Sequence, residues 1–140
     1  MTDLTCACAS ARQVARVLTQ LYDSRLRGAG LEAPQFALLI TLEKLEPCSQ
    51  VDLGRRHALD KTTVSRNLKL MERNGWIQSK VGADRRAREF TLTSAGRKHL
   101  AAGKPEWDKV QNELQSVLTP SQWKAMFRIF RTVTQAAQKL

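Results

Sequence analysis

Residues 49–92 constrain the fold more than any other part of this chain. Within them, two short helical patterns are followed directly by two stretches that alternate in polarity like antiparallel strands. The four predicted elements are helices at about 50–57 and 61–74 and strands at 76–81 and 88–92. Two helices joined by a tight turn and followed by a two-stranded hairpin predict a winged helix-turn-helix, in which the hairpin is the wing.

Residues suited to helix ends mark the boundaries of both short helices. Ser49 followed by Asp52 resembles a capping box, and Asp60 is a good N-cap for the second helix. Gly75 is suited to the left-handed conformation that ends a helix. The inward face of the second helix carries an i, i+4, i+7 stripe made up of Val64, Leu68 and Met71.

Positive charge is concentrated in the same region. From Gly54 to Arg88 there are ten Lys and Arg against three acids, so this quarter of the chain carries +7 of a formal net charge of +10. Outward faces of the helix at 61–74 carry hydroxyl and cationic groups, which bond phosphates and base edges. These include Thr62, Thr63, Ser65, Arg66 and Lys69. The charge and its placement favour double-stranded DNA as the partner.

Longer helices are predicted on both sides of this region. Residues 11–27 keep near-helical apolar spacing, and a second helix opens at Pro34 and closes before Pro47. Thr93 is suited to cap a further helix, which Pro105 is expected to interrupt or kink. Residues 119–122, Thr-Pro-Ser-Gln, are a strong start signal for a last helix with a bulky apolar stripe. That stripe is Trp123, Met126, Phe127, Phe130 and Val133.

Composition and motifs exclude several classes of protein. The longest strictly apolar run, Phe36–Ile40, is too short to span a bilayer, and no signal peptide opens the chain, so a cytoplasmic protein is expected. Three cysteines argue against a disulfide framework. No catalytic constellation, metal-ligand spacing or phosphate-binding Gly-rich loop is present. We therefore expect neither an enzyme nor a bound cofactor or metal, and expect the isolated His57 and His99 to be structural or solvated.

Four stretches together resemble the MarR family of bacterial transcriptional regulators. They are Leu59–Ile77, Asp84-Arg85-Arg86, Leu92–Gly96 and Pro34–Leu42. The resemblance implies a mainly α fold with a small β-hairpin wing, forming one domain over 1–140. About 34–100 would be the winged helix-turn-helix, with dimerisation helices at about 1–30 and 105–140. It also implies a homodimer bound to a palindromic operator, most commonly as a repressor.

The resemblance assigns roles to individual residues at the DNA. The helix at 61–74 would lie in the major groove, with Lys69 nearer the backbone. Thr62, Thr63, Ser65 and Arg66 would lie nearest the bases, and Lys61 is also expected to contact DNA. Arg86 of the wing would enter the minor groove, while Asp84 would brace the wing by pairing with a nearby arginine. Arg85 would be either a phosphate contact or a solvated charge.

Two kinds of signal would fit a regulator of this type. Cys8 and Tyr22 match the reactive cysteine and a thiolate-bonding tyrosine of the family's organic-hydroperoxide-sensing branch, OhrR. The positive end of a helix favours the thiolate form, and oxidised Cys8 would pair with Cys6, Cys48 or a small thiol. This chain has Ala33 where that branch has a second tyrosine. The alternative signal is a lipophilic anion bound between the dimerisation helices and the winged region.

A different function for the same fold is a winged-helix module that binds RNA or a protein partner. Such a module has no need for groove-spaced hydroxyls and a basic wing on one face. The charge placement therefore favours the DNA-binding regulator, and binding to a palindromic duplex would discriminate between the two.

Overall fold

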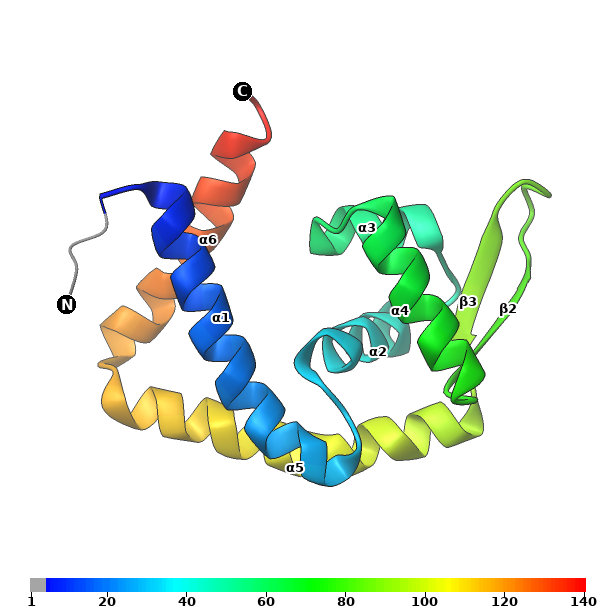
Figure 1. The fold of residues 1–140 in the computed structure, drawn as a ribbon, viewed down its shortest axis with the longest axis horizontal. Helices are drawn as coiled ribbons and strands as arrows, with labels where there is room; N and C mark the ends of the chain where they lie inside the picture. The colour runs from blue at the N-terminus through cyan, green and yellow to red at the C-terminus, as the bar shows by residue number, and fades with distance from the viewer. Residues whose placement is uncertain (1–4) are drawn as a thin grey trace. The chain divides into compact units, whose positions relative to one another are not determined.

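A computed structural model describes residues 5–140 and divides the chain into two compact units, one ending at Trp107 and one beginning at Asp108. The prediction of a mainly α protein with a small β wing is confirmed (Figure 1). The helices are α1 (Ala7–Leu26), η1 (Arg27–Ala29), α2 (Ala33–Leu45), α3 (Gln50–His57), α4 (Lys61–Arg73), α5 (Ser94–Val117) and α6 (Pro120–Ala137). The strands are β1 (Cys48–Ser49), β2 (Ile77–Val81) and β3 (Arg88–Leu92).

Local capping explains why the predicted helix starts agree with the structure. The Ser49 hydroxyl accepts the Asp52 amide at 3.1 Å, and the Asp60 carboxylate caps α4. Thr119 and Gln122 form a full capping box at the start of α6. Each of these bonds joins residues three apart, so the chain needs no tertiary contact to form it. One start differs from prediction, since α1 begins four residues earlier than residue 11.

The sheet has one more strand than the predicted hairpin. β1 pairs with β3, with Cys48 opposite Phe90, and the strand order is β1-β3-β2. Cys48 therefore lies in a short strand, which the sequence did not predict. A two-residue strand is too short to show alternation, and its partner lies forty-two residues further along the chain, so only the folded structure reveals it.

The core of the first unit lies beneath α4 and the sheet. The predicted stripe of Val64, Leu68 and Met71 is buried there, as expected. Residues from α2, α3, the sheet and α5 complete one cluster, which includes Phe36, Leu39, Leu42, Leu53, Ile77, Phe90, Leu92 and Leu100. Apolar side chains from eight elements meet in this cluster, so the recognition region rests on a continuous hydrophobic base.

Pro105 does not interrupt α5, so that part of the prediction is wrong. A proline costs a helix one hydrogen bond and crowds the preceding turn, and here packing on both sides of it supplies the compensation. Before it, Gly103 packs so closely on Leu31 that an added Cβ would lie 2.8 Å from the leucine side chain. After it, the Trp107 ring stacks on Phe36 with centroids 6.0 Å apart.

The second unit exposes a large apolar surface on α6. No residue of this helix is buried. Ile129 and Phe130 are 53% and 45% exposed, and Val133 is exposed as well. Trp123 and Phe127 pack edge to face, with ring centroids 5.0 Å apart. None of the described helices carries an apolar stretch long enough to cross a membrane.

Candidate nucleic-acid interface and effector cavity

The start of α4 is held by two bonds between Asp60 and Thr63. The Thr63 amide donates to Asp60 Oδ1 at 2.7 Å, and the Thr63 hydroxyl donates to Oδ2 at 3.0 Å. These bonds, the backbone one first, lower the pKa of the Asp60 carboxyl, so it is ionised whenever the helix is formed at neutral pH. The cap fixes the first residue of α4 and, with it, the positions of the outward side chains along the helix.

Five of the six α4 residues predicted to contact DNA line one shallow groove on the helix surface. They are Lys61, Thr62, Ser65, Arg66 and Lys69. Thr63 does not line this groove, and its hydroxyl donates to Asp60. Two hydroxyls among three cations on one face of a helix suit base edges and the phosphates on either side of a major groove.

The wing is a hairpin whose tip is closed by backbone bonds. The Gly82 amide donates to the Ala87 carbonyl, and the Ala87 amide donates to the Asp84 carbonyl, each at 3.0 Å. Asp84 Oδ1 also accepts the Arg86 backbone amide at 3.1 Å. Within the described residues no ion pair joins Asp84 to an arginine. Asp84 thus braces the turn through the backbone, which leaves the exposed Arg85 and Arg86 side chains available.

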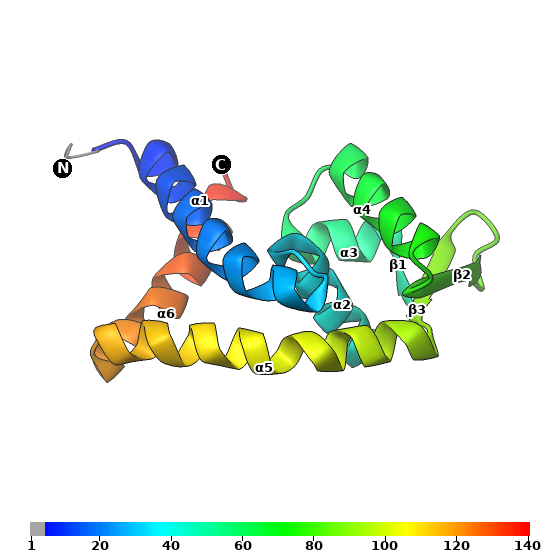
Figure 2. The same cartoon turned by 60° about the horizontal axis from the view of Figure 1, so that its bottom comes forward.

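Hydrogen bonds tie α4 to the base of the wing, and sequence reasoning missed most of them. The Ser79 hydroxyl on β2 donates to Glu72 of α4 at 2.9 Å. The Thr93 hydroxyl donates to the Gly75 carbonyl at 2.5 Å and accepts the Gly96 amide at 3.0 Å. Figures 1 and 2 both show α4 beside the hairpin. The recognition helix and the wing therefore present their cations as one arrangement.

A further set of polar contacts, made by Glu46, joins the end of α2 to the sheet. The Glu46 carboxylate accepts the Leu92 amide at 2.9 Å and pairs with the Arg97 guanidinium. Burial alone would raise the pKa of Glu46, but the Leu92 amide and Arg97 together hold it below its ordinary value. These contacts therefore need the ionised Glu46 carboxylate.

A cavity of about 590 Å³ lies between α1, α2, α3 and α5 in the first unit. Its lining combines six apolar residues with six polar ones of both charges, and small-molecule sites likewise place polar groups among apolar walls. The apolar lining is Leu26, Ala33, Phe36, Ala37, Ile40 and Trp107. The polar lining is Tyr22, Thr41, Glu43, Lys44, His57 and Lys104.

Two polar contacts organise the wall of this cavity, which we call the effector cavity. Lys104 Nζ donates to Glu43 Oε1 at 2.8 Å, and His57 Nε2 lies 2.8 Å from the Thr41 hydroxyl. Burial raises the pKa of the Tyr22 phenol and lowers the pKa of the His57 imidazole. Sequence reasoning left His57 isolated, because its partner Thr41 lies sixteen residues away on another helix.

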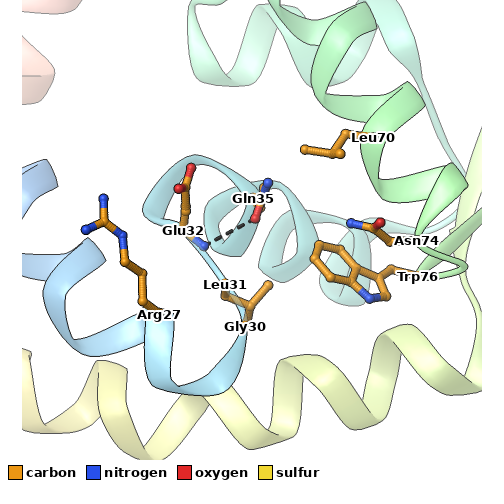
Figure 3. A pocket seen from close by; sticks show the side chains of 8 residues that line it. All are labelled: Arg27, Gly30, Leu31, Glu32, Gln35, Leu70, Asn74 and Trp76. Carbon is orange, nitrogen blue, oxygen red and sulfur yellow. Dashed lines mark hydrogen bonds between the residues drawn. The ribbon is translucent and has the colours of Figure 1, made fainter.

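A more open hollow lies between the η1–α2 connection and the end of α4 (Figure 3). Its most buried polar residue is Gln35, whose Oε1 accepts the Glu32 amide at 3.2 Å. That bond belongs to the capping box at the start of α2. Gln35 is therefore explained by helix capping, and the hollow separates Leu70 and Asn74 of α4 from the α2 start.

The cysteines lie in two different environments. Cys6 and Cys8 are exposed, at the N-cap and in the first turn of α1. Cys48 is buried, and burial together with the nearby Asp52 raises the pKa of its thiol. Cys8 and Tyr22 lie fourteen residues apart on one helix, about 21 Å at about 1.5 Å per residue, so they do not meet within one chain.

The fold and the basic face together define a winged helix-turn-helix DNA-binding protein. Comparison with known proteins assigns its family: the chain belongs to the MarR family of transcriptional regulators, whose sequence profile matches residues 29–87. It is 34% identical to the transcriptional regulator MosR of M. tuberculosis, solved in complex with DNA. That likeness covers 96% of this chain and 97% of the other, with a TM-score of 0.87.

A further relative agrees with the assignment, and another solved structure shares the fold. An uncharacterised HTH-type transcriptional regulator of Bacillus subtilis, YwoH, is 27% identical over 123 residues, which is 88% of this chain and 90% of that protein. The PcaV regulator of Streptomyces coelicolor shares the fold, with a TM-score of 0.85 at 20% identity over 98% of this chain and 99% of that one. The chain is thus a member of a family of DNA-binding regulators rather than of enzymes.

Proposed function

We propose that this protein is a homodimeric transcriptional repressor that binds a palindromic operator and is released by a chemical signal. The observation that carries the proposal is the groove of two hydroxyls and three cations on α4. Beside it the wing exposes Arg85 and Arg86. Within the described residues none of these cations forms an ion pair, which leaves their charges for phosphates and base edges.

The helices at the two ends of the chain support the dimer. Leu26 is the only residue of α1 that is buried, and α6 buries none. Val17 and Phe130 are examples of the apolar side chains that these helices leave in solvent. Exposed apolar patches of this kind mark association surfaces. A second copy of the chain is the occupant that the family implies, and it would set two recognition helices one helical turn of DNA apart.

The effector cavity supports a lipophilic anion as the signal. Its apolar walls fit an aromatic ring, and Lys44, Lys104 and His57 lie against only one acid, Glu43. A ligand that binds better to a dimer with misplaced recognition helices would shift the population away from DNA.

Oxidation of Cys8 is the second candidate signal, and its exposure in the first turn of α1 supports it. A bond from Tyr22 to this thiolate would have to come from a second copy of the chain. Residues two apart do not face each other on a helix, so a disulfide between Cys6 and Cys8 would unwind the start of α1. Cys48, buried with a raised pKa, is a poor partner.

A gel-shift assay on DNA upstream of the protein's own gene tests the proposal. We expect a palindromic duplex to be bound at moderate salt, and salicylate or cumene hydroperoxide to release it. Light scattering of the free protein should give the mass of two chains. A protein that binds single-stranded RNA but no palindromic duplex would contradict the regulator assignment, and a monomer would contradict the dimer.

A further inference from the structure

His57 occupies a position that no other described residue shares. It is the last residue of α3, the first helix of the helix-turn-helix, and it also lines the effector cavity. The other described residues that line this cavity come from α1, α2 and α5. A ligand in the cavity therefore has one direct contact with the DNA-reading pair of helices, and that contact is an imidazole.

The hydrogen bonds at this wall define what His57 offers to a ligand. The Thr41 hydroxyl has one hydrogen and donates it to the Ala37 carbonyl at 3.0 Å. With the hydrogen used in this way, a lone pair of Thr41 accepts at the 2.8 Å contact, and the His57 tautomer with its proton on Nε2 fits the pair. His57 is therefore the donor through Nε2–H, whether the ring is neutral or protonated. The wall presents a donor, which suits a carboxylate.

Among the charged and titratable groups that line the cavity, His57 is best placed to bind an incoming anion. From α5, Lys104 is already paired with Glu43 of α2, while Lys44 of α2 is exposed. Tyr22 of α1 contributes a phenol whose pKa is raised by burial, so it is neutral. Burial likewise lowers the pKa of His57, so at neutral pH the imidazole is uncharged and carries a single N–H.

We propose that His57 binds the carboxylate of an aromatic acid in the effector cavity and takes up one proton from solvent as it does so. This rests on the proposed function of the cavity as the ligand site. The bound carboxylate accepts from Nε2–H beside the Thr41 hydroxyl, and its charge stabilises the imidazolium that burial otherwise disfavours. Ligand binding and protonation of His57 thus become one linked event.

Because His57 ends α3 just before α4 begins, a change at His57 on ligand binding reaches the recognition helix through a short connection. Ala58, with φ of 50°, follows it directly, and Asp60, the cap of α4, is three residues away. The Leu59 amide donates to Gly54 of α3, so the connection is short and tied to α3. A ligand that draws the His57 ring away from Thr41 acts on the start of α4 through this connection.

The test is an NMR titration of the full-length protein, which has only two histidines. The imidazole proton resonances are followed from pH 4.5 to 8 without ligand, with salicylate, and with 2-hydroxybenzyl alcohol, a ligand of similar shape that lacks the carboxylate. His57→Gln assigns the resonances, and His99, stacked on Trp76, is the internal control. Calorimetry of salicylate binding in two buffers of different ionisation enthalpy counts the protons taken up.

We expect salicylate, and not the alcohol, to raise the titration midpoint of His57 while that of His99 stays constant. Calorimetry should show proton uptake near pH 6.5, and uptake should vanish in His57→Gln with affinity weakened roughly tenfold. Salicylate binding with no proton uptake, or with an unmoved His57 midpoint, would overturn the role of His57 and leave the cavity assignment standing. Absence of salicylate binding to the wild-type protein would overturn both.

Discussion

Thr63 bonds Asp60 twice, through its backbone amide and through its hydroxyl, at 2.7 and 3.0 Å. One residue predicted to read DNA is thus used to hold the start of the recognition helix. Its neighbours Thr62 and Ser65 line the groove on α4, so theirs are the hydroxyls that we propose for contact with DNA.

Asp60→Ala removes this cap and should destabilise the protein. We expect the midpoint of thermal unfolding to fall by about 3 °C, because loss of a helix cap typically removes a small fraction of the free energy of unfolding. Operator affinity should fall too, since the first turn of α4 frays. Asp60→Ser, which keeps a capping oxygen, is the matched control and should retain most of both properties. Equal loss in the two variants would contradict the capping role.

Gly96→Ala should be far more harmful than an alanine at another glycine. A Cβ at Gly96 would lie 1.9 Å from the Trp76 carbonyl oxygen, which is backbone and cannot move aside. We expect a loss of about 1–3 kcal/mol or more in the free energy of unfolding, measured with urea. Gly28→Ala is the control, because nothing lies within 4 Å of its added Cβ. A stable Gly96→Ala protein would show that the α5 start is not packed in this way.

Arg86→Ala should weaken operator binding by about tenfold or more while the oligomeric state stays unchanged. The reason is that the exposed side chain at the wing tip would lose its groove contact, whereas the turn is closed by backbone bonds that alanine keeps. Fluorescence anisotropy with a labelled duplex measures the affinity. Arg128→Ala, an exposed cation on α6, controls for the loss of one charge. Equal affinity in Arg86→Ala and wild type would remove the wing from the interface.

Cys8→Ser should keep operator binding and lose release by cumene hydroperoxide, because serine cannot form the sulfenic acid. Gel shifts with and without peroxide measure the effect. Cys48→Ser is the comparison variant, because the Cys48 thiol is buried and its pKa is raised. If this variant folds, peroxide should still release it from the operator. Peroxide-dependent release that persists in Cys8→Ser would eliminate the redox role of this residue and leave the cavity ligand as the signal.

The stability of the ligand-free protein should fall as the pH drops below about 6.5 because of His57. Its folded-state pKa lies below the ordinary value of 6.5, so the unfolded chain binds more protons in this window. The contribution is fully present above pH 6.5 and is lost as the pH falls through the folded-state pKa. His57→Gln should flatten this part of the profile in urea titrations. The window is separate from that of Asp60 and Glu46, whose lowered pKa values act at more acidic pH.

Much of the fold is readable from the sequence because its signals are local. The caps at Ser49, Asp60 and Thr119 each act over three residues, and apolar periodicity in α4 marks the buried stripe directly. The groove residues could be predicted for the same reason, since a helix that buries Val64 and Leu68 must present its other faces outward.

Tertiary structure decided the features that join distant segments. β1 exists only by pairing with β3, and Pro105 stays within α5 because Gly103 and Trp107 pack against α2 and its N-terminal connection. Likewise, His57 becomes part of a cavity only where α3 meets Thr41 of α2. Local capping and periodicity are encoded within a few residues, and the sequence alone determined them. Contacts across tens of residues depend on how the helices pack, and only the folded chain could supply them.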